Sequence, residues 1–179
     1  RAVKPAGPIP EIRMNERTVF FVSDGTAITA ETFGTAILAQ FQATRPAGQV
    51  EITMGPGAGA AANFLSLLAR TDLQGTYLAF CDQDDVWDAD HLRRALALLT
   101  RVNAPLALYG CLMRICDAYL HPLALSPLPQ KPLGFRNALL QNVLSGNTMV
   151  AAPDAARLLH AAAPEALAAG GVPVHDWWA

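Results

Sequence analysis

Three carboxylates directly follow an apolar run in the middle of the chain. The run covers residues 77–81, and the acids that end it are Asp82, Asp84 and Asp85. Magnesium and manganese prefer hard carboxylate oxygens, and they usually take one or two of them together with the phosphates of a substrate. The Asp-X-Asp spacing therefore indicates a divalent cation that holds a diphosphate. The alternative is a solvated acidic loop that only begins the next helix.

The segments beside the acids are expected to be a buried strand and an amphipathic helix. Residues 77–81 are apolar on both faces, which is typical of a strand in the centre of a covered sheet. In open α/β sheets, ligands bind beyond the carboxyl ends of the strands, where this strand places its acids. Asp88 and Asp90 follow, at a position where acids cap the free N–H groups of a helix. The helix itself is predicted by apolar residues at the spacing of one helical face: Leu92, Ala95, Leu96 and Leu99.

Strands and helices alternate along the rest of the chain, so the sequence predicts an α/β domain. Residues 125–133 contain three prolines and are expected to be an irregular connection. Further strands are predicted at residues 17–22, 50–54, 106–115 and 149–152. Further helices are predicted at residues 30–41, 60–70, 135–142 and 154–163, the last of them begun by Pro153.

Composition limits the class of protein. The chain has 179 residues, of which 52% are hydrophobic and 16% charged, so it is long and apolar enough for one globular domain. A net charge of -2 predicts no nucleic-acid partner. Three cysteines without metal spacing favour free thiols in a reducing cytoplasm. No transmembrane segment is expected, because polar residues interrupt the apolar runs, and residues 1–13 lack the apolar core of a signal peptide.

Two glycine-containing turns are weaker candidates for phosphate or nucleotide contacts. Ser23, Gly25 and Thr26 stand between a strand and a helix, where they would either cradle a phosphate or form an ordinary turn. Residues 55–59 (GPGAG) would either approach a nucleotide closely or form a plain turn. His160 lies on a mostly apolar helix, which favours a structural histidine over a ligand.

Four blocks in order resemble family 2 glycosyltransferases, especially their rhamnosyltransferase-like branch. CDQDDVW, at residues 81–87, is similar to the DQDD-W signature of that family. The other blocks are GPGAGAAANFLSLL at 55–68, FRNALLQNVLSGNTMV at 135–150 and VHDWW at 174–178. Together they span about the last two-thirds of the chain.

The resemblance implies a GT-A fold, in which a Rossmann-like, mixed but mostly parallel sheet lies between helices, here incomplete. It implies inverting transfer of a sugar, with rhamnose as a candidate, from a nucleotide-diphosphate sugar to a hydroxyl of a glycan or lipid-linked acceptor. Asp176 would be the catalytic base, and Asp84 with Asp82 would hold Mg²⁺ or Mn²⁺. The nucleotide-sugar would contact Gly57, Gly59, Asn63, Asp82 and Asp85. The acceptor side would contain Gly146, Asn147, Thr148, His175 and Trp177.

Residues 14–41 resemble a different family, the phosphoenolpyruvate synthase regulatory proteins, which are kinase/phosphorylases. That family places its nucleotide chemistry on a P-loop, and the chain contains no GxxxxGK[ST]. The opening motifs of a family 2 glycosyltransferase are also missing. The sequence therefore predicts a chimera: a flexible tail at 1–13, with Met14 as a natural start, a regulatory-protein unit at 14–49 and a glycosyltransferase body at 50–179, packed as one domain.

Two alternatives to an active glycosyltransferase stay open. One is a non-catalytic glycosyltransferase fragment that lacks its opening and its last helix. The other is a regulatory kinase/phosphorylase, which the missing P-loop disfavours. The expected location is the cytoplasm, and a more specific expectation is the inner face of the membrane.

Overall fold

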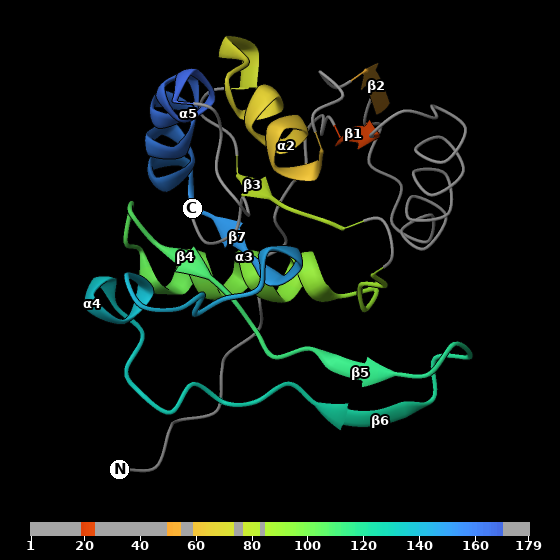
Figure 1. Cartoon of the computed structure of the whole chain (residues 1–179). Coiled ribbons are helices and arrows are strands. Elements are labelled where there is room, and N and C mark those ends of the chain that lie inside the picture. Colours follow the sequence, from red (N-terminus) through yellow and green to blue (C-terminus); the bar gives the residue numbers. More distant parts are fainter. Residues whose placement is uncertain (1–18, 24–49, 55–58, 74–76, 83–84, 170–179) are drawn as a thin grey trace.

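The computed structural model describes residues 19–23, 50–54, 59–73, 77–82 and 85–169. Strands and helices alternate along these ranges (Figure 1). The strands are β1 (Val19–Ser23), β2 (Val50–Met54), β3 (Leu78–Ala79), β4 (Leu108–Tyr109), β5 (Arg114–Cys116), β6 (Pro122–Leu125) and β7 (Val150–Ala151). The helices are α2 (Ala60–Leu68), α3 (His91–Val102), α4 (Phe135–Ala138) and α5 (Pro153–Ala168), with short 3-10 turns at Thr71–Leu73 and Gly146–Thr148.

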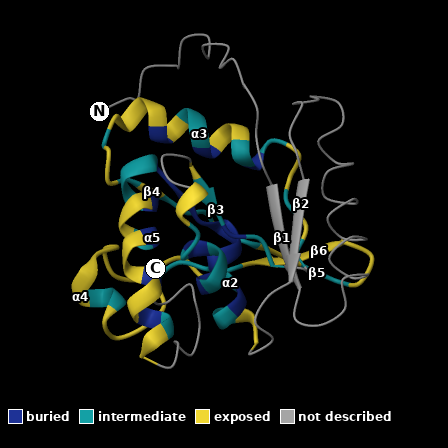
Figure 2. Cartoon of the chain, turned by 90° about the horizontal axis from the view of Figure 1, so that it is seen from above, coloured by how far each residue is buried: buried dark blue, intermediate teal, exposed yellow. Residues whose placement is uncertain are grey.

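A small sheet lies between two helical layers. The strand order is β3-β7-β4, and β7 is antiparallel to both neighbours. On one face, Met149 and Phe80 pack with Leu65 and Leu68 of α2 and with alanines of α5. On the other face, Val150 belongs to a second cluster, with Ala95 and Leu99 of α3. Buried positions gather where the helices meet these strands, so the described core has an α/β layered arrangement (Figure 2).

The centre of this sheet is β7 rather than the strand before the acids. The prediction of a central strand at residues 77–81 is wrong for the described strands, because β3 is an edge of the order β3-β7-β4. The segment 149–152 is buried at every position, whereas Tyr77 is 44% exposed and Leu78 and Ala79 are half-buried. The more fully buried run therefore takes the place with a neighbour on each side. Residues 78–80 do meet apolar clusters on both faces, as their composition predicts.

The first two strands form a separate parallel pair. β1 and β2 run in register from Val19 opposite Val50 to Ser23 opposite Met54. Both strands were predicted, but within the described ranges no ladder joins them to β3-β7-β4, contrary to the expectation of one shared sheet. Helix α2 contacts β1 as well as α5. The helix predicted at residues 30–41 lies outside the described residues.

The single strand predicted at residues 106–115 is two strands. β4 ends at Tyr109, and β5 begins at Arg114 and forms a hairpin with β6. Between them, a Cβ atom on Gly110 would lie 2.7 Å from a terminal side-chain carbon of Leu144, so a larger residue here would require the Leu144 side chain to shift. An apolar run gives no sign of such a close approach. β6 also extends over residues 122–125, which shortens the irregular proline-rich connection that the sequence predicts.

Two helices confirm the helical pattern of the sequence. The buried face of α3 contains Ala95 and Leu99, and the helix ends at Asn103 in the left-handed conformation that favours asparagine or glycine. Pro153 begins α5 as expected. Asp90 stands at the N-cap of α3 without a side-chain capping bond, which corrects the predicted capping role. Within the described ranges, no helix is long and apolar enough to cross a membrane.

His160 joins α5 to the end of α2. Its side chain is buried, and its Nδ1 atom lies 2.6 Å from the carbonyl oxygen of Leu68. A carbonyl only accepts hydrogen bonds, so Nδ1 carries the proton and donates it. This bond satisfies a carbonyl of the last turn of α2, which has no partner inside its own helix. The prediction of a structural histidine is confirmed.

Replacing His160 by leucine is expected to lower the free energy of unfolding by about 1–3 kcal/mol, because a buried carbonyl loses its donor. His121 is the matched control, since its side chain is exposed on the hairpin and its ion pair with Asp117 is a surface one. His121→Leu should stay within about 0.5 kcal/mol of the parent chain. Urea unfolding of both variants measures the difference, and equal losses would contradict the structural role of His160.

Candidate functional site

The acids that the sequence singles out follow β3 directly. Asp82 and Asp85 are described, whereas Asp84 lies outside the described residues. The backbone N–H of Asp85 donates to the carbonyl of Asp82 at 3.4 Å, so these two residues lie close together. Both carboxylates therefore belong to one short loop at the carboxyl end of an edge strand.

Asn147 connects this loop to a second segment that the sequence also predicts. It lies in the 3-10 turn Gly146–Thr148 and is only 6% exposed. Its side-chain Nδ2 donates to a carboxylate oxygen of Asp85, although the two residues are 62 positions apart. Its backbone carbonyl accepts a hydrogen bond of 2.7 Å from the indole N–H of Trp87. One residue thus binds the acidic loop at two points.

The turn around Asn147 has its own internal hydrogen bonds. The hydroxyl of Thr148 donates to the Ser145 carbonyl at 2.7 Å, and the Met149 N–H donates to the Gly146 carbonyl at 2.9 Å. Thr148 is therefore occupied by turn chemistry, which was the alternative to a role on the acceptor side. The Asn147 side chain reaches out of its turn instead, toward Asp85 and toward the sulfur of Met113 at 3.4 Å.

The side-chain oxygen of Asn147 is a buried acceptor that receives no hydrogen bond. A carboxylate only accepts, so the amide nitrogen must face Asp85 and the oxygen must face elsewhere. A buried polar atom left unpaired costs about 1–3 kcal/mol, and such atoms are uncommon. A hydroxyl or N–H group of a bound molecule would satisfy it.

A row of aromatic rings connects the acidic loop to α3 and β4. The ring of Trp87 lies 4.8 Å from that of His91, which in turn lies 5.9 Å from that of Tyr109. His91 is buried, its Nε2 atom has no hydrogen-bond partner, and burial lowers the pKa of the imidazole. A neutral histidine therefore fills the space between Trp87 and β4. The sequence pattern did not predict roles for His91, Tyr109 and Met113, although the position of His91 just after the acidic loop was a signal.

The loop carries concentrated negative charge. Burial, and then the charges of Asp82 and Asp85, raise the pKa of the Cys81 thiol to about 12. The outer acids are compensated differently: Asp88 pairs with Arg94 and Arg114, and Asp90 pairs with Arg93 and Arg94. Arginines therefore neutralise the helix side of the loop.

The donor set agrees with a hard divalent cation, since both described acids offer carboxylate oxygens. Within the ranges that the structure describes, no cluster of three or more histidine, cysteine, aspartate or glutamate side chains could hold a metal. Magnesium does not require such a cluster, because substrate phosphates and water complete its shell. Asp82 with the neighbouring Asp84 would supply the protein ligands, as the sequence predicts.

Other predicted site residues are placed only in part. Gly59 begins α2 with φ of +97°, a conformation that favours glycine, and the space beside it is open. Asn63 is buried in the first turn of the same helix, where its N–H donates to the Gly59 carbonyl at 3.1 Å. The remaining predicted site residues lie outside the described residues: Gly57, His175, Asp176 and Trp177. The same holds for Gly25 and Thr26 of the first glycine-containing turn.

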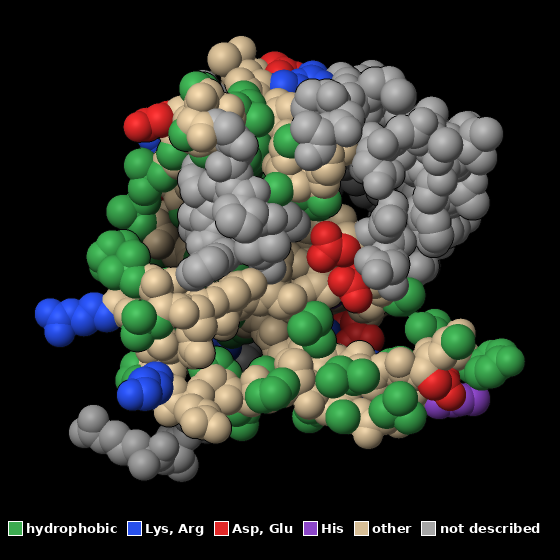
Figure 3. All heavy atoms as spheres, viewed as in Figure 1, with side chains coloured by type: hydrophobic (Ala, Val, Ile, Leu, Met, Phe, Trp, Pro, Cys, Tyr) green, Lys and Arg blue, Asp and Glu red, His purple; other side chains and the backbone are tan. Residues whose placement is uncertain are grey.

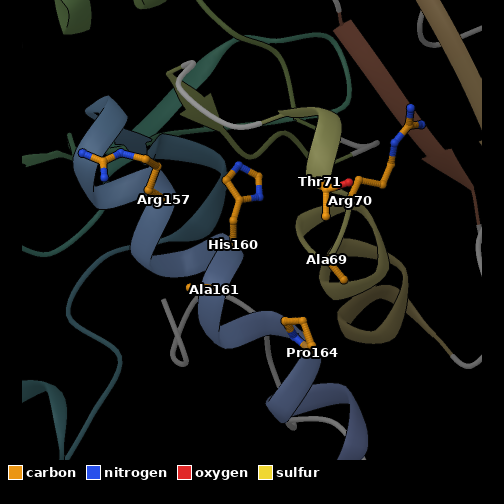
Figure 4. Close-up of a pocket in the computed structure, with 7 residues that line it drawn as sticks. All are labelled: Ala69, Arg70, Thr71, Arg157, His160, Ala161 and Pro164. Atoms are coloured by element: carbon orange, nitrogen blue, oxygen red, sulfur yellow. The ribbon is translucent and has the colours of Figure 1, made fainter.

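A pocket of about 350 Å³ lies apart from the acidic loop, between the end of α2 and α5. Figure 4 shows its lining, in which Arg157 and His160 come from the same helix but point in different directions. The two arginines of the lining already have partners, since Arg70 pairs with Asp72 and Arg157 pairs with Asp154. The acidic loop with Asn147 is therefore the stronger candidate site.

Replacing Trp87 by phenylalanine should lower the free energy of unfolding by about 1–2 kcal/mol. The ring would still pack on His91, but the Asn147 carbonyl would lose the indole N–H. Tyr119→Phe is the control, because it removes a polar hydrogen from an exposed aromatic residue and should change stability by less than about 0.5 kcal/mol. Guanidinium unfolding of both variants distinguishes a supporting hydrogen bond from a dispensable one.

A short segment of the chain is similar to known proteins. No family model matches the chain, and no solved structure matches it. A stretch of 29 residues is 79% identical to the phosphoenolpyruvate synthase regulatory protein of Polaromonas sp. strain JS666 and 83% identical to that of Verminephrobacter eiseniae. The match to the protein of Methylibium petroleiphilum is 80% identical over 30 residues.

These matches cover 16–17% of this chain and 11% of each relative, so the chain spans about a tenth of the length of the curated relatives it matches. They confirm that a short N-terminal segment is similar to this regulatory family. No match supports the resemblance of residues 50–179 to family 2 glycosyltransferases, which stays a prediction.

Proposed function

We propose that residues 50–179 form a glycosyltransferase body that moves a sugar from a nucleotide-diphosphate sugar to a hydroxyl group, with inversion. The observation that carries this proposal is the double link from Asn147 to the acidic loop, through Asp85 and Trp87. It joins two of the four blocks on which the resemblance rests. A loop that only preceded a helix would need no such link to a turn 62 residues away.

The acids of the loop have separate roles in this proposal. Asp84 and Asp82 would hold Mg²⁺ or Mn²⁺, which when bound neutralises the diphosphate as it leaves the sugar. Asp85, which Asn147 orients, would bind the ribose or the donor sugar, as the resemblance implies. The unpaired Asn147 oxygen would accept a neighbouring hydroxyl of the same substrate. Gly57, Gly59 and Asn63 would bind the nucleotide, as the resemblance implies.

Asp176 would act as the catalytic base. It would take the proton from the acceptor hydroxyl while the hydroxyl oxygen bonds to the anomeric carbon of the sugar. The bond from that carbon to the diphosphate breaks on the opposite face, which gives inversion. His175 and Trp177 would lie with Gly146 on the acceptor side, where a glycan or lipid-linked hydroxyl enters, while the Thr148 hydroxyl stays bonded within its turn. The site would work in the cytoplasm or at the inner face of the membrane.

A second function is favoured by a different observation, the 79–83% identity of a short segment to phosphoenolpyruvate synthase regulatory proteins. A regulatory kinase/phosphorylase is therefore the alternative, although the chain contains no GxxxxGK[ST]. A non-catalytic chimera is the third possibility. It would share the fold of the body without binding a sugar nucleotide.

Thermal unfolding in the presence of a nucleotide-sugar panel tests the proposal. A ligand at about 100 times its dissociation constant stabilises the folded chain by about 2.7 kcal/mol. For a chain of this size, that corresponds to an increase in Tm of roughly 5–10 °C. The increase should require manganese and should appear with a nucleotide-diphosphate sugar. If adenosine diphosphate raises Tm and an attached sugar makes no difference, the result would support the regulatory alternative instead.

A further inference from the structure

His91 has no role in the proposed sugar transfer, yet its side chain is buried beside the acidic loop. It is the first residue of α3 and is only 4% exposed. Its Nε2 atom is buried and, among the described residues, has no hydrogen-bond partner. Buried polar atoms of this kind are uncommon, because leaving them unpaired destabilises the folded chain.

The ring of His91 connects β4 to the acidic loop. Its centroid lies 4.8 Å from that of Trp87 and 5.9 Å from that of Tyr109. Trp87 is in turn fixed to the 3-10 turn before β7, because its indole N–H donates to the carbonyl oxygen of Asn147. The side chain of Asn147 donates to Asp85 of the loop. A chain of contacts thus runs from His91, through Trp87 and Asn147, to a carboxylate of the candidate site.

The charged groups around His91 are paired with one another. Arg94 faces it from α3, Asp90 from the start of that helix and Asp88 from the loop. Arg94 forms ion pairs with both of these acids. On the side of β4, burial raises the pKa of Tyr109, so its phenol stays neutral. An imidazolium at this position would therefore meet carboxylates that an arginine already neutralises.

Protonation of His91 would place a positive charge and a second N–H in this buried space. Both ring nitrogens of an imidazolium are donors, and Nε2 has no acceptor among the described residues. Burial is the largest cause that lowers the pKa of His91, and the charge of Arg94 acts in the same direction. The neighbouring β7 adds the apolar side chain of Val150. The neutral ring is therefore the form that fits beside Trp87.

We propose that His91 is a positioning residue of the acidic loop: its neutral ring holds Trp87 on the turn, and its protonation releases the link from Asn147 to Asp85. Trp87 packs in neither of the two core clusters, so the loop can open while the sheet and helices stay packed. On the face shown in Figure 3, acidic side chains gather at the surface above the β5–β6 hairpin. The consequence for sugar transfer rests on the proposed function, whereas the opening of the loop does not.

The direction of the pH dependence follows from the two forms of the loop. In the open loop the His91 imidazole is hydrated and has the ordinary pKa of about 6.5, whereas burial lowers this pKa in the closed loop. The open form therefore binds the proton more tightly, and acid favours opening. The equilibrium constant for opening should rise by up to about tenfold for each pH unit below the ordinary pKa, until the closed form titrates as well.

Hydrogen exchange of the Trp87 indole N–H measures this opening in the full chain, and Trp87→Phe identifies its NMR signal. Exchange is compared at each pH with that of His91→Phe, so that the intrinsic pH dependence of exchange cancels. This variant keeps an aromatic ring that cannot be protonated, so the parent should open more than the variant in acid. His121→Phe is the matched control, because His121 is exposed on the hairpin, and it should open in acid as the parent does.

The parent chain gives a second measurement that needs no variant. The Cε1–H signal of His91 should titrate below the ordinary pKa, and the indole signal of Trp87 should move with the same midpoint. A midpoint at or above the ordinary pKa, or an acid response that His91→Phe retains, would overturn the proposal. So would an equal loss of protection at the Ala152 N–H, which donates to Ala107 beside β4, since acid would then unfold the whole chain.

Titration of nucleoside diphosphates with manganese separates the role of His91 from the proposed function. Acid should weaken binding by the parent more than binding by His91→Phe, and an equal loss in both would contradict control of the site by His91. If the parent binds no nucleotide at any pH while the exchange results hold, the sugar-nucleotide site fails and the positioning role of His91 is retained.

Discussion

Replacing Asp84 by alanine is expected to abolish manganese-dependent binding of nucleoside diphosphates. The substitution removes both a negative charge and a ligand from a hard-ion site, in which the protein contributes only one or two carboxylates. The remaining acids would not compensate, because Asp85 is held by the side chain of Asn147. Calorimetric titration of nucleoside diphosphates with manganese measures the loss.

Asp72→Ala is the matched control for that experiment. Asp72 is exposed, pairs with Arg70, and has its pKa lowered first by the hydrogen bond from that arginine. It lies in the 3-10 turn after α2 rather than in the acidic loop. The control variant should bind nucleotide as the parent chain does. Undiminished binding by Asp84→Ala would show that the cation, if it binds, is held elsewhere.

Replacing Asp176 by asparagine is expected to preserve nucleotide binding and to slow transfer by about 10²–10⁴-fold, the usual scale for losing a general base. Asparagine keeps the size and polarity of the side chain, but it has no proton affinity at neutral pH. Release of nucleoside diphosphate from a sugar nucleotide, with water or an added glycan as acceptor, measures the rate. The titration described for Asp84 measures the binding.

Asp154→Asn provides the comparison for the base. Asp154 is a surface aspartate that pairs with Arg157 at the start of α5, away from the acidic loop. It should leave both the binding and the rate unchanged. A rate equally reduced in both variants would indicate a general loss of folded protein, and an unchanged rate in Asp176→Asn would assign the base to another residue.

Periodic patterns predicted α2, α3 and α5 because such patterns are local, whereas α4 ends at Ala138, four residues before the predicted end. Ala95 and Leu99, four residues apart, lie on the buried face of α3, and Pro153 marks the start of α5. His160 was assigned a structural role for the same reason, since an apolar helix surrounds it. These features depend on a few neighbouring residues, which the sequence shows directly.

Strand placement was harder to predict because it depends on distant partners. Residues 77–81 and 149–152 are both apolar runs, and only burial by α2, α3 and α5 decides which one is central. At the break, Gly110 lies against Leu144, whose side chain would have to shift to admit a Cβ atom. Neither fact has a signal in the local pattern.

The residues of the candidate site were predicted from local patterns, but the contacts between them were not. Carboxylates after a strand and a polar turn before β7 were both visible as residue types, and the resemblance named Asp85 and Asn147 separately. Their hydrogen bond was not predicted, because it joins segments 62 positions apart. The supporting stack of Trp87, His91 and Tyr109 was also missed, since it brings together rings from the loop, α3 and β4.

The most direct test of the central claim is a calorimetric titration of the parent chain with nucleoside diphosphates, in the presence and absence of manganese. The proposed site predicts saturable binding of one nucleotide per chain, dependent on the metal, with a preference for one base. Absence of binding by every nucleotide in the presence of manganese would contradict a sugar-nucleotide site at Asp82–Asp85 and would favour a non-catalytic chain.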